Sequence, residues 1–510
     1  MFEFRDFDLK GPRPSHAGAL TQDLELEVLF QAMAGSDKFM LEAVRAACLE
    51  TLEEPSAIRY RQQILEDCLR HPTIIRSLYA VAVAGVEGGR KVWRGTLNRY
   101  PDRVLYWSME LLRSFMSQLR RLREIADEHG AKFHSKGLST LLRMLAKELD
   151  EGYLATVEAH LRQLKFPEGI LMSAELGEGN RGTKYTLRAS RSALPGWTQR
   201  LRALIERLPR RDRTSYVYQV DARDESGANA LAELKNRGIG AVASALAQSA
   251  DHVEGFFEML RAELAFYVGC LNLADRLSAQ GESICLPEVM DESVPVWSGR
   301  GLYDVALSLT AASPVVGNDL DADGKALIMI TGANRGGKTT GLRSLGQAQV
   351  MMQCGMFVAA RSYRANACSG IFTHFRRQED PGMKSGKFDE ELARMSAIIA
   401  RLKPGGLLLF NESFSSTNAR EASEIASEIV GALLEARIKV AYVTHLFDLA
   451  HGFYLHRRER TLFLRAERRP DGTRTFRLPE GPPSPTSYGE DLYRRIFSTA
   501  TAERAAELSH

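Results

Sequence analysis

The sequence predicts a multidomain protein in which a mostly helical part is followed by an α/β domain. The chain has 510 residues, which is more than one ordinary core accommodates. Apolar residues recur at helical spacing up to about residue 280, whereas short apolar runs alternate with helical patterns from about Pro287 onwards. We therefore expect a helical core domain over residues 1–150, a region with a small β element and a long helix over residues 151–285, and an α/β domain over residues 286–510.

Composition limits the classes of function. Hydrophobic residues make up 44% and charged residues 26% of the chain, which is typical of a globular protein. The formal net charge is only +3, so binding to a nucleic acid would have to come from local basic patches. The sequence has no apolar run of membrane-spanning length, a charged start and no CxxC pair. These features predict a cytoplasmic protein with reduced thiols and no membrane association.

Three segments of the helical part can be placed from their apolar pattern. One helix is expected from Pro55 to Arg70, because proline stands near its start and the His71-Pro72 pair ends it. A second covers residues 105–119, where a 4-3-4-3 apolar spacing predicts one packing seam. The third runs from about Gly240 to Ala279, and at 1.5 Å per residue it would be roughly 60 Å long. A helix of that length suggests an arm or lever.

Residues 170–187 and the stretch after them have a different pattern. Apolar and polar side chains alternate around several glycines, which predicts a β-hairpin or small sheet. Ten basic residues against two acidic ones lie between Arg181 and Arg213. Such a run is commonly a solvated face, but it could also lie along a nucleic-acid backbone and gain free energy by counterion release. The candidate DNA contacts are Arg188, Arg210, Arg211 and Arg213.

Three apolar runs in the C-terminal part predict buried parallel strands, over residues 326–330, 407–410 and 440–443. A loop and a helical pattern follow each of them. The carboxyl ends of parallel strands form the ligand-binding edge of an α/β sheet, so the residues after these runs are the first candidates for a site. Beyond Arg457 we expect a strand pair followed by a terminal helix.

The strongest motif is Gly332-Ala-Asn-Arg-Gly-Gly-Lys338-Thr339, which fits G-x-x-x-x-G-K-[ST]. It follows an apolar strand and precedes a helix start, which distinguishes a phosphate-binding loop from a glycine-rich turn. Glycine lets backbone N–H groups face the phosphates, Lys338 would neutralise their oxygens, and the Thr339 hydroxyl can bind Mg²⁺. The predicted nucleotide contacts are Gly332, Asn334, Gly336, Gly337, Lys338, Thr339 and Thr340.

Two further strand ends carry polar residues. The run at 407–410 ends in Asn411-Glu412, where an acid usually holds Mg²⁺ and the next glutamate deprotonates a water. The amide of Asn411 can still bind Mg²⁺ but brings no charge, so we expect weaker metal binding and slow hydrolysis, with Glu412 as the general base. His445 follows the third run and would contact the γ-phosphate or the attacking water. The Asn411-Glu412 pair and His445 could instead be ordinary strand ends with a purely structural role.

Read together, these motifs resemble the MutS family of DNA mismatch-repair ATPases, whose catalytic domain is of the ABC-like P-loop class. The similarity is carried by residues 314–320, 330–340, 354–360, 409–417 and 444–449 and by Ser487-Tyr488-Gly489. It is strong over about residues 285–495. It is weaker over residues 20–280, where the helical core and the long helix look like the family's core and lever region.

The resemblance implies a C-terminal ABC-like ATPase domain over residues 286–510 and a lever or clamp-like region over residues 151–285. ATP and Mg²⁺ would be the cofactors, with Lys338, Glu412 and His445 as catalytic residues and with Thr339 and Asn411 on the metal. Ser385 resembles the serine that reaches in trans to the γ-phosphate, which implies a homodimer through the ATPase domains. Hydrolysis would open and close a clamp on double-stranded or branched DNA, for repair or recombination, in the cytoplasm or at the nucleoid.

The sequence also departs from the family pattern. It shows no N-terminal mismatch-reading domain and no Phe-Tyr-Glu element to wedge beside a mispaired base, so the resemblance is to a short form. Asn411 stands where the family has the Walker B aspartate. The alternative is therefore a nearly inactive, nucleotide-gated DNA clamp or scaffold without mismatch specificity. A phosphotransferase acting on a small molecule is a third class, and the long helix and the lack of a recognisable lid count against it.

Overall fold

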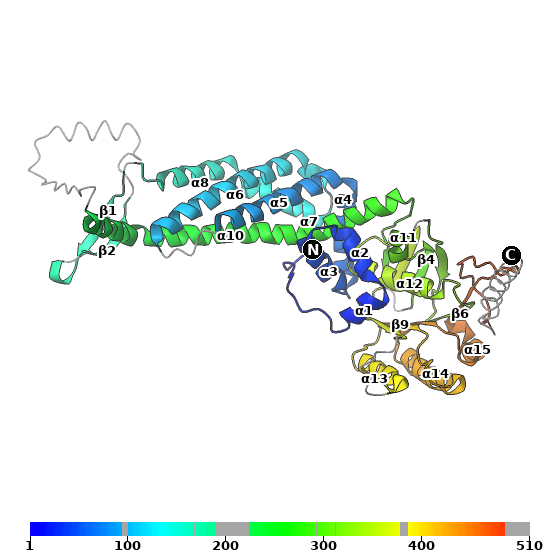
Figure 1. The fold of residues 1–510 in the computed structure, drawn as a ribbon. Helices are drawn as coiled ribbons and strands as arrows, with labels where there is room; N and C mark the ends of the chain where they lie inside the picture. Colours follow the sequence, from blue (N-terminus) through cyan, green and yellow to red (C-terminus); the bar gives the residue numbers. More distant parts are fainter. Residues whose placement is uncertain are drawn as a thin grey trace, which may run out of the picture. The chain divides into compact units, whose positions relative to one another are not determined.

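The computed structural model describes residues 1–93, 100–167, 169–180, 182–188, 224–291, 294–311, 313–377 and 386–484 (Figure 1). The chain divides into two compact units. The α/β unit comprises Met1–Arg76, Phe133–Ser139 and Ala262–His510, and the helical unit comprises Ser77–Lys132 and Thr140–Arg261. This combination of helices with α/β sheets confirms the predicted α plus α/β class. The three-part division at residues 150 and 285 stays a prediction.

The helical unit is built from long helices that run side by side in Figure 1. They are α5 (Pro72–Trp93), α6 (Pro101–His129), α7 (Lys136–Glu148), α8 (Glu151–Gln163) and the first part of α10 (Glu225–Ala279). The predicted seam of α6 is buried at all five positions, Leu105, Met109, Leu112, Met116 and Leu119. The rings of Phe115 and Phe257 lie 5.5 Å apart and join α6 to α10. Burial of this seam therefore holds the bundle together.

Two further expectations fall in the helical unit. The predicted β element is confirmed as an antiparallel hairpin of β1 (Met172–Leu176) and β2 (Gly182–Leu187). The long helix was expected from about Gly240, but α10 begins at Glu225. Residues 225–236 of α10 are mostly exposed, so this first part has no buried apolar stripe for a sequence pattern to reveal. Helix formation there rests on local propensity and on continuity with the packed part.

The α/β unit begins with helices at its N-terminal end. These are α1 (Ala17–Asp23), α2 (Leu26–Ala34), α3 (Lys38–Leu49) and α4 (Pro55–Arg70), and α4 has the predicted bounds. The carboxylate of Asp37 caps α3 by accepting from the backbone N–H groups of Phe39 and Met40. Arg61 of α4 is fully buried, and its guanidinium donates to the carbonyl oxygens of Ala47 and Cys354. These bonds fix α4 to elements far away in the sequence.

Two sheets form the centre of the α/β unit. The larger one is parallel throughout and has the order β11-β6-β10-β9-β8. Its strands are β6 (Leu327–Gly332), β8 (Ile371–Phe375), β9 (Leu407–Asn411), β10 (Lys439–Val443) and β11 (Thr461–Ala466). The three apolar runs found in the sequence are β6, β9 and β10, as predicted. The smaller sheet, of order β3-β7-β4-β5, contains β3 (Glu288–Met290), β4 (Trp297–Leu302), β5 (Asn318–Asp321) and β7 (Ser362–Asn366).

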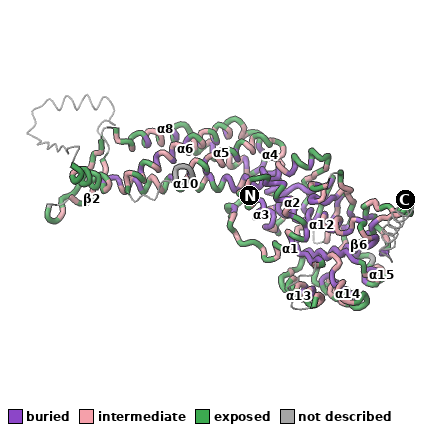
Figure 2. The backbone as a smooth tube through the Cα atoms, in the orientation of Figure 1, coloured by how far each residue is buried: buried purple, intermediate pink, exposed green. Residues whose placement is uncertain are grey.

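Helices cover both faces of the parallel sheet. On one face lies α12 (Lys338–Gln353), which also contacts β4 of the smaller sheet. The other face is covered by α13 (Lys387–Ile399), α14 (Ala419–Glu435) and α15 (Phe447–His456). Figure 2 shows the buried residues gathered along β6 and α12. In the part of the chain that the structure describes, no helix is long and apolar enough to span a bilayer. The expected terminal helix lies outside the described residues.

Gly85→Ala tests the close packing of α5 on α10. A Cβ at Gly85 would lie 2.5 Å from the ring of Phe257, so we expect a loss of about 1–3 kcal/mol in the free energy of unfolding. Gly255→Ala is the matched control, because a Cβ there meets no atom within 4 Å and alanine favours the helix by up to about 1 kcal/mol. Urea unfolding followed by circular dichroism measures both. Equal stability of the two variants would contradict this packing.

Candidate functional site

The phosphate-loop motif lies between the end of β6 and the start of α12. Gly332 and Gly337 have φ angles of 110° and 89°, in the left-handed region that favours glycine. A Cβ on Gly336 would lie 2.8 Å from the carbonyl oxygen of Ala333, so a side chain there would block the turn. The glycines of the motif are therefore needed for the tight loop that leads into the N-terminus of α12, where backbone N–H groups are free to receive an anion.

Lys338 is the first residue of α12, and its side chain folds back over the loop. Only 5% of the residue is exposed, and its Nζ donates to the carbonyl oxygens of Gly332 at 3.0 Å and Ala333 at 3.1 Å. Burial lowers the pKa of Lys338 to about 8, although the carboxylate of Glu412 acts in the opposite direction. A buried ammonium group with two carbonyl partners can exchange them for the more negative oxygens of a phosphate.

Thr339 and Asn411 bring two oxygen atoms together. The Thr339 hydroxyl donates to Oδ1 of Asn411 across 3.0 Å, although 72 residues separate them in the sequence. Mg²⁺ binds oxygen atoms at about 2.1 Å in an octahedron, so that neighbouring ligands are about 3.0 Å apart. The two oxygens therefore fit a shared Mg²⁺ ion. They supply no negative charge, so the charge that holds the ion would have to come from phosphate.

Glu412 follows β9 directly and contacts His445, which follows β10. Their side chains are 2.7 Å apart between Oε1 of Glu412 and Nε2 of His445, and each is about one-third exposed, at 29% and 31%. The bond to His445 lowers the pKa of Glu412, with a smaller contribution from Lys338, while burial opposes the shift. Glu412 is therefore a carboxylate at neutral pH, and it can accept a proton.

A cavity of about 500 Å³ opens beside these residues. One side is made by the phosphate loop and Glu412, and the other by α11 (Val305–Thr310) and the segment that follows it. Its described lining residues are Leu307, Ala311, Ser313, Pro314, Val315, Val316, Asn318, Asn334, Arg335, Gly336, Gly337, Lys338, Thr339, Thr340, Glu412 and Phe476. Polar and charged groups thus lie on one side of the cavity and mostly apolar groups on the other.

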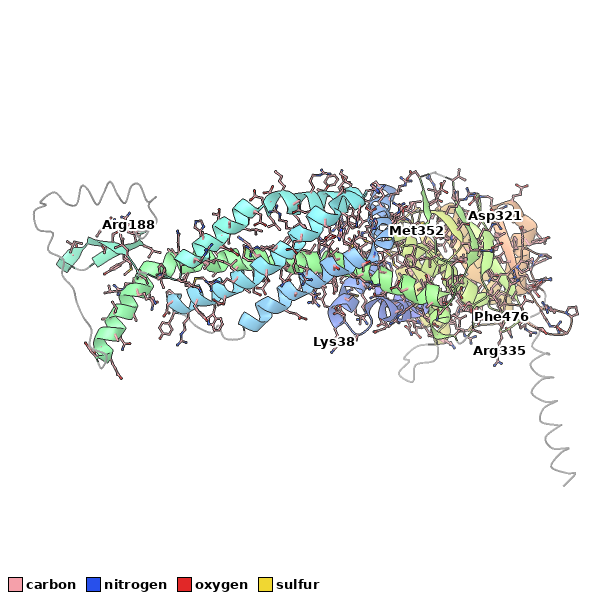
Figure 3. The ribbon with its side chains drawn as sticks, turned by 90° about the horizontal axis from the view of Figure 1, so that it is seen from above. Lys38, Arg188, Asp321, Arg335, Met352 and Phe476 are labelled. Carbon is pink, nitrogen blue, oxygen red and sulfur yellow. The ribbon has the colours of Figure 1, made fainter. Side chains whose placement is uncertain are left out.

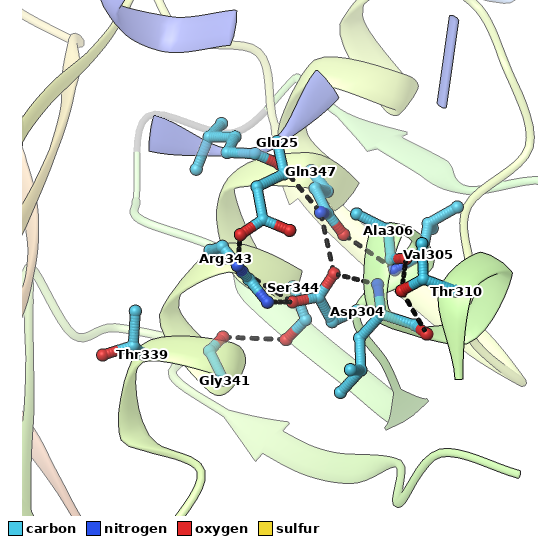
Figure 4. A network of polar contacts seen from close by, with 12 residues as sticks. Glu25, Asp304, Val305, Ala306, Thr310, Thr339, Gly341, Arg343, Ser344 and Gln347 are labelled. Atoms are coloured by element: carbon cyan, nitrogen blue, oxygen red, sulfur yellow. Dashed lines mark hydrogen bonds and ion pairs between the residues drawn. The ribbon is translucent and has the colours of Figure 1, made fainter. Parts of the chain in front are cut away.

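Asp304 fixes the apolar wall to α12 (Figure 4). Its carboxylate caps α11 at the N–H of Leu307 and accepts from Arg343 at 2.7 Å and from Gln347 at 2.9 Å. Arg343 also pairs with Glu25. Asp304 is 1% exposed, and such a buried carboxylate is stabilised only where several donors meet it. Because α11 and the phosphate loop are both tied to α12, the two sides of the cavity keep their separation.

A hairpin after β11 completes the cavity with Phe476. The side chain of Asn318 donates to the carbonyl oxygen of Phe476 at 3.2 Å and accepts from the N–H of Leu478 at 2.7 Å. Arg474 donates to the carbonyl oxygen of Asn334 at 3.3 Å, so the hairpin is also bonded to the phosphate loop. Figure 3 shows Phe476 beside Arg335, and the residue is half exposed. An exposed ring held at this place can stack on a flat ligand.

The structure brings most of the predicted site residues together. The predicted residues that line the cavity are Asn334, Gly336, Gly337, Lys338, Thr339, Thr340 and Glu412. The other three contact lining residues: Gly332 is bonded to Lys338, Asn411 to Thr339, and His445 to Glu412. Arg188 lies after β2 in the helical unit, where its side chain bonds Ser173. Ser385, Arg210, Arg211, Arg213 and the Ser487-Tyr488-Gly489 segment lie outside the described residues.

Sequence reasoning missed the lining residues of α11 and the segment after it, Arg335 of the loop, and Phe476. Residues 314–318 lie in a segment that carried the family resemblance, but no site role was inferred for them. Phe476 gave no signal, because no motif surrounds it and its partner Asn318 is 158 residues away. Besides the resemblance, the sequence offered only the apolar run at residues 314–316 as a clue.

Lys338→Met should raise the melting temperature of the nucleotide-free protein at pH 7 by several degrees, because it removes a buried charge. The unfolded chain binds this proton up to the ordinary pKa of 10.5, and the folded chain only up to about 8. The destabilisation by Lys338 is therefore complete below pH 8 and fades between pH 8 and 10.5. Calorimetry at pH 7 and pH 10 should show the difference from wild type shrinking. Lys403→Met, at an exposed site, should show no such trend, and a pH-independent difference for Lys338→Met would contradict the buried charge.

Comparison with known proteins finds similarity to MutS-type proteins over two parts of the chain. Residues 53–280 match the family described as MutS2 N-terminal domain, and residues 328–495 match MutS domain V. The chain is 27% identical over 152 residues to MutS protein homolog 4 of Mus musculus, which covers 30% of this chain and 16% of that protein. It is 31% identical over 195 residues to the DNA mismatch repair protein MutS of Porphyromonas gingivalis, which covers 35% of this chain and 22% of that protein. The similarity thus spans about a fifth of these relatives. With both family models matched in chain order, this chain belongs to the MutS-like mismatch repair family.

Proposed function

We propose that this chain is an ATPase that couples nucleotide binding and hydrolysis to the binding of DNA. The observation that carries the proposal is the convergence of Lys338, Thr339, Asn411 and Glu412 at one cavity, with His445 bonded to Glu412. Membership of the MutS-like family supports it, because the relatives are named for DNA mismatch repair. The matched segments cover only part of those relatives.

In the proposed reaction, the triphosphate lies along the N-terminus of α12. Lys338 exchanges its carbonyl partners for phosphate oxygens, and the added negative charge raises its pKa, so nucleotide binding is accompanied by proton uptake near pH 8. Thr339 and Asn411 are the residues that would hold Mg²⁺, and a bound Mg²⁺ would supply positive charge to the phosphates. Phe476, from the hairpin beside the phosphate loop, stacks on the base of the nucleotide.

Glu412 acts as the general base in this proposal. Its lowered pKa keeps it ionised, so that it can orient a water and take its proton during attack on the γ-phosphate. His445 occupies one oxygen of the same carboxylate. When His445 turns to the γ-phosphate, that oxygen is released for the water. The pair thus links the presence of the third phosphate to the availability of the base.

We further propose that two chains form a homodimer through their ATPase domains, over residues 286–510. Ser385 reaches the γ-phosphate of the partner, which makes each ATP site composite. Residues 151–285 serve as a lever or clamp region, in which Arg188, Arg210, Arg211 and Arg213 contact the backbone of double-stranded or branched DNA. Opening and closing of the clamp in the cytoplasm or at the nucleoid then follows the nucleotide state.

A second candidate function is a nucleotide-gated DNA clamp or scaffold with almost no turnover. Asn411 favours it, because an amide at this strand end supplies no charge to Mg²⁺. The two functions share the nucleotide site and the DNA contacts. They differ in whether Glu412 is used for chemistry.

Glu412→Gln tests the ATPase directly. Loss of a general base lowers turnover by about 10²–10⁴-fold, so we expect a fall of that size in Mg²⁺-dependent phosphate release with ATP affinity retained. Glu421→Gln, an exposed glutamate on α14, is the control and should turn over like wild type. Equal, negligible rates for wild type and Glu412→Gln would reject the enzyme and leave the nucleotide-gated clamp.

Asn411→Asp tests the proposed metal site. A carboxylate next to Thr339 adds a charge within contact distance of Mg²⁺, and we expect the Mg²⁺ concentration for half-maximal turnover to fall on the order of tenfold. Titration of phosphate release with Mg²⁺ measures this. Asn418→Asp, at the N-cap of α14, is the control for added charge alone and should leave the titration unchanged. No shift for Asn411→Asp would remove this residue from the metal site.

Charge reversal of Arg210, Arg211 and Arg213 tests the DNA contact. Binding to duplex or branched DNA should weaken as salt rises, and the triple reversal should weaken it for all DNA sequences and flatten the salt dependence. Reversal of Arg401, Arg420 and Arg437, which are exposed in the α/β unit, changes the net charge equally and should have a much smaller effect. Fluorescence anisotropy with ADP and with a non-hydrolysable ATP analogue measures both. Binding that ignores salt, or equal losses for the two triple variants, would exclude the proposed patch.

A further inference from the structure

The backbone that carries Glu412 is strained. Glu412 and Phe414 have φ angles of 53° and 64°, although neither is glycine. Residues other than glycine rarely adopt this left-handed backbone conformation, because it brings the Cβ atom close to the backbone. Two strained residues around Ser413 persist only where neighbouring groups hold the segment in place. The contacts of Ser413 therefore decide where the Glu412 carboxylate points.

Ser413 is held by side chains from two strands. The hydroxyl of Tyr442, on β10, donates to the carbonyl oxygen of Ser413 at 2.9 Å. The hydroxyl of Ser413 lies 2.8 Å from Nδ1 of His374, on β8, and also contacts the carbonyl oxygen of that histidine. All three residues are at most 1% exposed, so water cannot replace these bonds. Buried hydrogen bonds thus fix the residue after Glu412 from two directions.

His374 is fixed in turn by α13 and by Phe414. Its Nε2 lies 3.0 Å from the carbonyl oxygen of Glu391, which can only accept, so Nε2 carries the proton. Nδ1 is then an acceptor, and it shares the one hydroxyl proton of Ser413 with the carbonyl oxygen of His374. Burial lowers the pKa of His374 to about 4, and the ring is neutral at physiological pH. The ring of Phe414 stacks on it, with centroids 5.4 Å apart and an interplanar angle of 22°. Phe414 is fully buried, which holds its left-handed backbone in place.

We propose that His374 and Tyr442 are positioning residues that hold Glu412 in the orientation required of a general base. Neither lines the cavity, and both act through Ser413. This inference rests on the proposed ATPase function and adds to it the hydrogen bonds that stabilise the strained Glu412–Phe414 segment. In sequence, His374 lies 38 residues before Glu412 and belongs to none of the nucleotide motifs.

Tyr442→Phe is the sharpest test, because it removes one hydroxyl and keeps the ring in the core. Losing a bond of about 1 kcal/mol that positions the base should lower the single-turnover hydrolysis rate on the order of five- to tenfold, with ATP affinity within about twofold of wild type. Tyr363→Phe is the matched control. Its buried hydroxyl bonds Trp297 and Gln349, so it loses similar stability but should hydrolyse ATP like wild type.

A double mutant separates positioning from general damage. If Tyr442 acts through Glu412, Tyr442→Phe should cause almost no further loss in a Glu412→Gln background. His374→Leu should lower the rate as Tyr442→Phe does, and His374→Asn, which keeps an acceptor near Ser413, should recover part of it. Wild-type rates for Tyr442→Phe, or an equal fall in both backgrounds, would overturn the proposal.

An NMR measurement tests the positioning role of His374 and Tyr442 even if the protein does not turn over ATP. The side-chain ¹⁵N signal of His445, assigned with His445→Gln, reports the bond to Glu412. It should shift in Tyr442→Phe and His374→Leu and stay in place in Tyr363→Phe. Equal, negligible hydrolysis by wild type and Glu412→Gln would reject the ATPase, whereas an unmoved His445 signal would reject the positioning role.

Discussion

The parallel pairing of β6, β10 and β9 is the constraint on which the site depends. In the register of this sheet, Val443 pairs with Ile330 on one side and with Asn411 on the other. The ladder continues one residue further, where the N–H of Glu412 donates to Val443 and that of Thr444 donates to Ile330. The phosphate loop, Glu412 and His445 therefore leave the sheet at the same edge. A slip of one residue in any of these strands would turn the side chains to opposite faces and separate them.

The strand ends also show how the site tolerates groups that would be unfavourable elsewhere. Lys338 is a buried cation whose partners in the described structure are neutral carbonyl groups, and Glu412 and Phe414 have left-handed backbones. Packing of the surrounding hydrophobic core offsets the unfavourable free energy of these groups. Phe410, Phe414 and Tyr442 belong to one buried cluster with α14 and α15, so the strained residue Phe414 lies in a hydrophobic core. An anion at the loop would pair with Lys338 and offset the unfavourable free energy of burying its charge. The nucleotide-free site is therefore suited to binding phosphate.

The sequence predicted the part of the site that local patterns encode. Apolar runs located β6, β9 and β10, and the residues after them contained Lys338, Asn411, Glu412 and His445. The glycine spacing predicted the loop, because φ angles such as that of Gly337 require that residue type. What it could not predict depends on contacts between distant segments. His374 follows Thr373 in a short, mostly apolar run, and only its burial against Ser413 and Glu391 gives it a role. Phe476 likewise has meaning only through Asn318.

The same distant contacts tie the phosphate-loop helix to the N-terminal helices of its unit. Just past its middle, α12 bonds the α1–α2 junction, where Gln347 donates to the carbonyl oxygen of Leu24. At its end, Gln353 donates to the carbonyl oxygen of Leu52, and Arg61 of α4 donates to that of Cys354. These bonds are buried, so α12 cannot shift without either breaking them or carrying α2–α4 along. Because a buried donor or acceptor left without its partner is destabilising by about 1–3 kcal/mol, we expect a displacement of α12 to be passed on to the N-terminal helices.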